Sequence, residues 1–66
     1  MGQFKYKVLR YTVTLYDGKN IRDMVFTNTV TIARNKFNDF CKRIDGTKAT
    51  LVDNESEELI KVWEWV

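Results

Sequence analysis

The spacing of apolar residues changes twice along this chain, and these changes restrict its fold more than any other feature. Up to about residue 27, apolar side chains recur at every second position, which is the period of a half-buried strand. From Ala33 to Ile44 they recur at every third or fourth position, which is the period of an amphipathic helix. From Thr47 the strand-like spacing returns. The sequence therefore predicts strands, one helix, and strands again.

A hairpin signal divides the segment before the helix. Residues 3–16 are typical of one long strand, and Asp17-Gly18 follows it. Both residues of an Asp-Gly pair accept a positive φ, which tight hairpin turns require. A second strand is expected over residues 20–27. Two registers fit the turn, because a two-residue loop pairs Tyr16 with Lys19 and a four-residue loop pairs Tyr16 with Ile21.

Both registers predict the same division of side chains between the two faces of the hairpin. The apolar face is expected to carry Leu9, Tyr11, Val13, Leu15, Met24 and Phe26. Asp23 falls on the other face, together with Arg10 and Thr12. On that face Asp23 and Arg10 can form a cross-strand ion pair.

A single apolar stripe defines the helix. Its members lie at i, i+4, i+7, i+8 and i+11 and are Ala33, Phe37, Phe40, Cys41 and Ile44. Thr29 or Thr31 can cap the first turn, because a hydroxyl oxygen accepts hydrogen bonds from unpaired backbone N–H groups. Lys42 and Arg43 are expected in the last turn, where the helix dipole favours cations. Gly46 is expected to end the helix in the left-handed conformation.

Two further strands are expected after the helix. A third strand is expected over residues 47–53, and a polar turn follows over residues 53–57. The fourth strand is expected over residues 58–66 and carries apolar side chains on both faces. We therefore expect one domain over residues 1–66. It belongs to the α+β class, with ββαββ order and a four-stranded antiparallel sheet that packs one helix on one face.

The chain lacks the residue types that most catalytic and metal sites need. It has no histidine and a single cysteine, so it can build neither a Cys/His zinc site nor a histidine-activated thiol. Cys41 lies on the buried stripe, where it is expected to act as a small core hydrophobe. Asp17-Gly18-Lys19 and Asp45-Gly46-Thr47 are typical of turns, not of a phosphate-binding loop. We expect no enzyme, no cofactor and no bound metal.

The strands carry more apolar surface than one helix can cover. Phe4, Tyr6 and Tyr16 fall on the sheet face opposite the helix, and the fourth strand adds Trp63 and Trp65. Contiguous apolar patches of more than a few hundred Å² usually mark interaction sites. These five residues are therefore the predicted protein interface, for a homodimer or another protein target. A curled sheet, or a terminal segment that folds back, is the alternative.

A nucleic-acid interface is the second functional hypothesis. Single-strand binders combine basic side chains with aromatic platforms on a sheet. The basic candidates here are Lys5, Lys7, Arg10, Arg34 and Lys42. The formal net charge is only +2, from 11 basic and 9 acidic residues, which favours a protein partner over nucleic acid. A third hypothesis is a structural or regulatory subunit of a larger assembly.

Several short motifs resemble a known family of phage proteins. Tyr11-Thr12-Val13-Thr14 leading to Asp17-Gly18-Lys19, a central helix, and a closing strand around Glu58-Leu59-Ile60-Lys61 resemble the small dimeric uracil-DNA glycosylase inhibitors of Bacillus phages. The resemblance implies a homodimer whose apolar groove captures a protruding side chain of a host enzyme. Those inhibitors are acidic mimics of DNA, whereas this chain has a sequence pI near 8.8.

The predicted location is the cytoplasm, which is the host cytoplasm if a phage encodes the protein. No apolar run approaches the roughly 20 residues that span a bilayer. The first residues carry no apolar core of a signal peptide. A membrane partner is therefore not expected.

Overall fold

The secondary structure follows the predicted ββαββ order. The computed structural model describes residues 9–65. Its elements are β1 (Tyr11–Asp17), β2 (Asn20–Thr27), α1 (Val30–Cys41), β3 (Lys48–Asp53) and β4 (Glu58–Glu64). The first strand begins later than expected, since Leu9 and Arg10 precede it. The rest of the predicted first strand, residues 3–8, lies outside the described residues.

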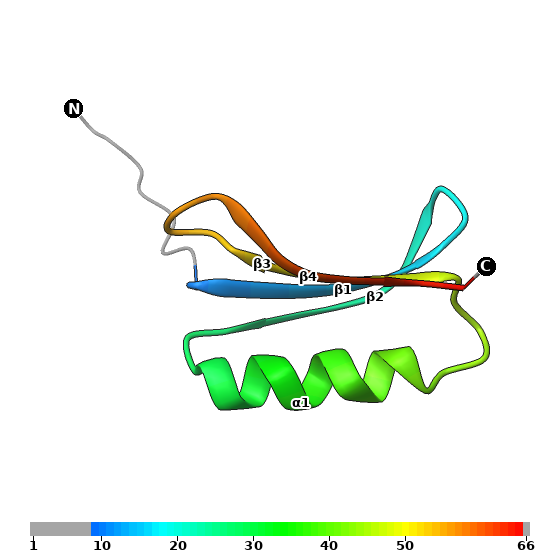
Figure 1. Cartoon of the computed structure of the whole chain (residues 1–66), viewed down its shortest axis with the longest axis horizontal. Helices are drawn as coiled ribbons and strands as arrows, with labels where there is room; N and C mark the ends of the chain where they lie inside the picture. The colour runs from blue at the N-terminus through cyan, green and yellow to red at the C-terminus, as the bar shows by residue number, and fades with distance from the viewer. Residues whose placement is uncertain (1–8, 66) are drawn as a thin grey trace.

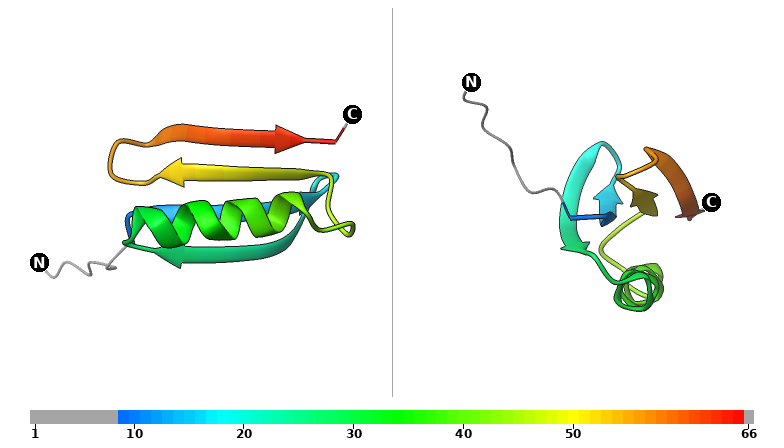
Figure 2. Two further views of the ribbon diagram at one scale, coloured as in Figure 1. Left: turned by 60° about the horizontal axis from the view of Figure 1, so that its bottom comes forward. Right: turned by 90° about the vertical axis from the view of Figure 1, so that its left-hand side faces the viewer.

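The four strands form one antiparallel sheet in the order β2-β1-β3-β4. Two hairpins are therefore joined through the central pair β1 and β3, and β2 and β4 are the edges. The helix lies along one face of this sheet, and none of the helices and strands within residues 9–65 lies over the other face (Figures 1 and 2). The predicted fold class is confirmed for the part of the chain that the structure describes.

The core lies between the two central strands and the helix. Val13, Leu15, Ala49 and Leu51 alternate along β1 and β3 and are fully or almost fully buried. The helix contributes three buried residues, which are Ala33, Phe37 and Phe40. The predicted apolar stripe is confirmed at these three positions. Cys41 is half-buried against this core.

The helix ends earlier than the apolar stripe predicts. Its last residue is Cys41, so Lys42 and Arg43 follow the helix and do not lie in its last turn. Ile44 is 93% exposed and does not belong to the core. At the other end Thr29 is the N-cap residue, but its side chain makes no capping hydrogen bond.

Gly46 has a different role from the predicted one. Among residues 9–65 only Gly18 and Glu57 have a positive φ, so Gly46 is not a left-handed helix stop. It is buried, and a Cβ at this position would lie 2.7 Å from Cγ of Leu15. Gly46 is therefore needed because the loop after the helix passes directly over the core.

A β-bulge in β2 reverses the predicted faces of this strand. The pairing of Tyr16 with Ile21 is one of the two expected registers. Arg22 is then an extra residue, because the next pair joins Leu15 to Asp23. The expectation that Met24 and Phe26 share the face of Val13 is wrong: they pair with Thr14 and Thr12, and so lie on the face away from the helix. Asp23 accordingly lies on the helix face, and not with Arg10.

A second bulge changes the alternation of β4. Leu51 pairs with Lys61 and Val52 pairs with Leu59, so Ile60 is the extra residue. Leu59 and Val62 consequently share the face away from the helix. Trp63 pairs with buried Ala49, which places it on the helix side.

The sheet is twisted into a saddle. The tip of the β1–β2 hairpin and the tip of the β3–β4 hairpin lie at opposite ends of the sheet, and both turn away from the helix layer (Figure 1). Right-handed strand twist raises opposite corners of a sheet in this way. The face without a helix therefore has two raised corners and a lower diagonal between them.

Candidate functional site

The face of the sheet away from the helix is the candidate site, and we call it the open face. The strand register arranges its side chains in three rows that cross all four strands in the order β2-β1-β3-β4. The rows are Phe26-Thr12-Val52-Leu59, Met24-Thr14-Thr50-Val62 and Ile21-Tyr16-Lys48-Glu64.

Apolar side chains lie at both edges of the open face and threonines lie at its centre. Phe26 and Val62 are each 51% exposed, and Ile21, Met24 and Leu59 are exposed as well. Thr14 and Thr50 are buried although no helix or strand among the described residues covers them. Every buried side-chain nitrogen or oxygen among residues 9–65 has a hydrogen-bond partner. The open face therefore has a largely polar floor between two apolar ridges.

The open face carries almost no net charge. Its rows contain one base, Lys48, and one acid, Glu64, which are neighbours across β3 and β4. The ammonium of Lys48 also lies 5.6 Å from the ring centroid of Tyr16, within the range of a cation–π contact. Both charges lie in one row, so the other two rows are uncharged.

The structure separates the residues that the sequence grouped as an interface. Tyr16 lies on the open face. Trp63 and Trp65 do not: Trp63 packs against the core on the helix side, and its ring meets that of Trp65 edge-on at 5.1 Å. Phe4 and Tyr6 lie outside the described residues.

Sequence reasoning missed the five apolar residues of the two ridges as a group. Two extra residues, Arg22 and Ile60, decide on which face these side chains fall. Neither bulge has a signal such as glycine at its position. The alternating pattern of each strand was visible, but its phase relative to the neighbouring strand was not.

The three described basic residues proposed for nucleic acid, Arg10, Arg34 and Lys42, do not form one surface. Arg34 is exposed on α1 and Lys42 follows the helix, on the side opposite the open face. Arg10 instead holds Asp53, with Nε 3.3 Å from one carboxylate oxygen and Nη2 3.1 Å from the other. These hydrogen bonds lower the pKa of Asp53 and raise that of Arg10. Lys5 and Lys7 lie outside the described residues.

A shallow pocket of about 240 Å³ lies beside this ion pair, but its polar groups are already engaged. It is lined by Leu9, Arg10, Asn28, Asn54 and Glu55. The Asn54 amide donates to the carbonyl of Leu9 and to the Thr12 hydroxyl, at 2.8 and 2.7 Å. The Asn28 side chain accepts from the backbone N–H of Arg10 at 2.8 Å. These contacts fasten the chain entering β1 to the β3–β4 turn through Asn54 and to the β2–α1 loop through Asn28.

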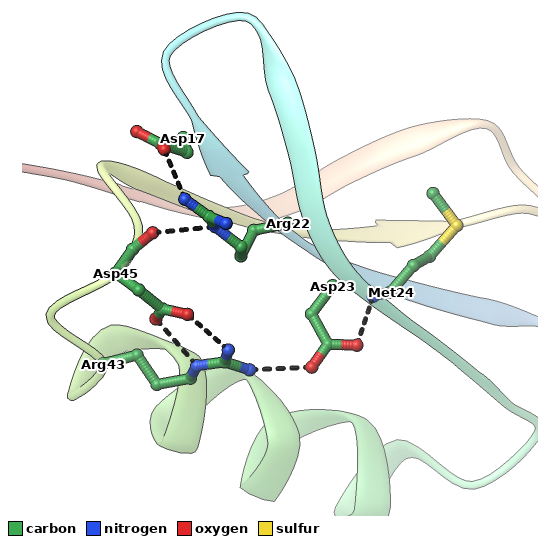
Figure 3. A network of polar contacts seen from close by, with 6 residues as sticks. All are labelled: Asp17, Arg22, Asp23, Met24, Arg43 and Asp45. Atoms are coloured by element: carbon green, nitrogen blue, oxygen red, sulfur yellow. Dashed lines mark hydrogen bonds and ion pairs between the residues drawn. The ribbon is translucent and has the colours of Figure 1, made fainter.

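An ion network fastens the end of the helix to β2. Arg43 donates to Asp23 at 2.7 Å and to both carboxylate oxygens of Asp45, at 2.9 and 2.6 Å (Figure 3). These bonds raise the pKa of Arg43 and lower the pKa of both aspartates. Arg22 joins the network through the Asp17 carboxylate and the carbonyl of Asp45. The network is structural, because each of its charges faces an opposite charge.

Residues 9–65 contain no group of three or more acidic or cysteine side chains that could hold a metal ion. Burial raises the pKa of the Cys41 thiol, which lowers the fraction of reactive thiolate. Among the same residues no helix is both long and apolar enough to cross a bilayer.

Comparison with protein-family models, with curated proteins and with solved structures finds no match to this chain.

Proposed function

We propose that this chain is a non-enzymatic protein-binding module and that the open face is its contact surface. One observation carries the proposal. Five exposed apolar residues stand along the two edges of a face that no helix or strand of the described part of the chain covers: Ile21, Met24, Phe26, Leu59 and Val62. Leaving them in water costs about 25 cal/mol for each Å² of apolar surface. A protein partner removes this cost.

The chemistry of the open face favours protein over nucleic acid as the partner. Phosphate-binding surfaces gather several lysines and arginines. The open face has Lys48 alone, and Glu64 next to it cancels its charge. Arg10 already satisfies Asp53, while Arg34 and Lys42 lie on the helix side. A salt-sensitive nucleic-acid complex would need a different surface.

The cellular setting is part of the same proposal. We infer a cytoplasmic protein of the kind by which phages and mobile elements inhibit a host or defence protein. The support is the combination of a very small fold, the absence of histidine and a surface suited to capture protein. The resemblance to the phage inhibitors of uracil-DNA glycosylase also implies an apolar contact surface, and the open face would supply it.

Photocrosslinking tests whether the open face is the contact surface. A photoreactive phenylalanine analogue is placed at Phe26 or at Val62, and at Ile44 as a control that is even more exposed. After irradiation in cells that make the protein, we expect discrete crosslinked proteins from positions 26 and 62 and none from position 44. Equal crosslinking at all three positions, or none at any, would contradict the proposal.

A further inference from the structure

We propose that the partner seated on the open face is a second copy of this chain, which packs face to face across a two-fold axis. The inference rests on the proposed function, since it names the occupant of the same surface. Such an interface is isologous, so one surface must be complementary to itself. The shape, the charge and the width of the open face each meet this condition.

The saddle shape of the open face matches its own copy. Two opposite corners of this face are raised and the diagonal between them is low (Figure 1). A two-fold axis lying along or across the strands maps a saddle of this kind onto a surface of the same form. Two sheets with the same twist therefore stack without a gap, as the aligned layers of β-sandwiches do. A partner of unrelated shape has no such built-in fit.

The charges of the open face also permit self-association. A surface with several charges of one sign would repel its copy, whereas this one has a single base and a single acid, Lys48 and Glu64. Its net charge is zero. Both charges lie in the end row, so the two uncharged rows can be buried without burying an unpaired charge.

The width of the apolar surface favours a sheet over a helix as the occupant. The two ridges stand on β2 and β4, three strand spacings or about 14 Å apart. A helix about 10–12 Å wide laid along the centre would rest on β1 and β3, between the two ridges. A second four-stranded sheet reaches both ridges at once.

The area of the open face sets the expected strength of the dimer. Four strands about 4.8 Å apart and three rows about 6.7 Å apart give roughly 400 Å² in plan for each copy. Side-chain relief increases this value, and the total for two copies falls near the lower limit of about 1,200 Å² for specific interfaces. We therefore expect a reversible dimer with a Kd on the order of micromolar.

Sedimentation equilibrium of the purified chain over a range of concentrations tests the dimer. The wild-type protein should pass from the 7.9 kDa monomer to twice that mass, and no further. Val62→Glu or Met24→Glu should raise Kd at least about tenfold, because an isologous interface buries each substituted residue twice. Val62→Thr keeps the side-chain shape and removes only apolar character, so it should raise Kd about threefold or more.

The matched control is Ile32→Glu, which introduces the same charge on α1 at a residue 46% exposed, against 51% for Val62. It should leave Kd unchanged. Far-ultraviolet circular dichroism confirms that each variant is folded. A dimer that persists unchanged in both Val62→Glu and Val62→Thr would overturn the inference, because it would form through another surface such as a sheet edge.

The same data separate failure of this inference from failure of the proposed function. If the pure chain stays monomeric at 1 mM, on the order of a thousand times the expected Kd, the second copy is excluded. Crosslinks from positions 26 and 62 to other proteins would then leave the open face as a protein-binding surface. If those crosslinks are absent too, both proposals fail.

Discussion

On the helix side of the sheet, the inner strands carry the fully buried apolar residues, and the edge strands carry polar residues together with Val25 and Trp63, which are only partly buried. Val13, Leu15 and Leu51 are buried under α1, while Asp23 of β2 and Lys61 of β4 stand at the two edges. Both edge residues still contact the helix side of the core: Asp23 binds Arg43, and the Lys61 ammonium lies 5.7 Å from the centroid of the Phe37 ring.

On the open face the order is reversed. Three of the six inner-strand positions are threonines, and the edge strands carry the large exposed apolar residues. The difference indicates that the apolar residues of each face are distributed according to the width of the element or partner that covers that face. A single helix fully shields only the two central strands, so the fully buried apolar residues of the sheet are confined to them. On the open face the exposed apolar residues lie on the edge strands, and only a partner as wide as the sheet would contact both edges.

Truncation of a core side chain should lower the free energy of unfolding far more than truncation of a side chain on the open face. Leu15→Ala removes a fully buried side chain from the helix side, and we expect a loss of about 2–5 kcal/mol in the free energy of unfolding. That is comparable to the whole stability expected for a domain of this size. Val62→Ala on the open face should cost about 1 kcal/mol or less in the monomer. Urea denaturation at low protein concentration measures both; equal losses would mean that the open face is also part of the core.

A methyl group at Gly46 should have the next largest effect. Its Cβ would overlap Leu15 and lie 3.0 Å from the carbonyl oxygen of Tyr16, so Gly46→Ala should cost about 1–3 kcal/mol. The reason is overpacking, so the cost should shrink when Leu15→Val makes room, which a double-mutant cycle measures. Gly18→Ala is the control: it meets no atom within 4 Å, but its φ of 64° disfavours alanine. Leu15→Val should not reduce the cost of Gly18→Ala.

Acid should weaken the attachment of β2 to the helix. Arg43 holds the pKa of Asp23 and Asp45 lower in the folded protein than in the unfolded chain. Their stabilisation is therefore complete above the unfolded pKa, near 4, and is lost as pH falls through the folded values. Thermal melts should show Tm falling most steeply below about pH 4. Asp23→Asn should flatten this fall, whereas Asp39→Asn, an exposed helix residue, should leave its slope unchanged.

A better helix cap should have the smallest effect on the free energy of unfolding. It should stabilise the helix side of the sheet without affecting association through the open face. Thr29 makes no side-chain capping bond, and the first turn of α1 has no acidic residue. Thr29→Asp should supply both, adding about 0.5–1 kcal/mol to the free energy of unfolding. Thr29 lies outside the open face, so the dimer Kd should not change. A change in Kd of more than about threefold would link the helix to the open face.

Local patterns in the sequence predicted the fold class and most of the helix. The spacing of Ala33, Phe37 and Phe40 is regular enough to give both the element and its buried side. Asp17-Gly18 gave the hairpin and one of its two registers correctly. These features depend on neighbouring residues, so they can be read without knowing the tertiary structure.

The faces of the edge strands could not be predicted in the same way. Each bulge shifts the phase of a strand by one residue, and only pairing with β1 or β3 decides where the extra residue falls. Ile44 was assigned to the core because its spacing continues the stripe, but the helix stops at Cys41. Gly46 follows the helix as a helix stop would. Glycine is needed there because a Cβ would overlap the side chain of Leu15, which is distant in sequence.

The bulge at Arg22 also has a consequence for how this gene can change in length. Loss of the Arg22 codon would give β2 the same number of residues as β1, and every other pair between the two strands would stay in place. Loss of a codon between Met24 and Thr27 would instead exchange inward and outward positions along part of the strand. Homologous genes are therefore expected to differ by a codon at this point more readily than within β1 or β3.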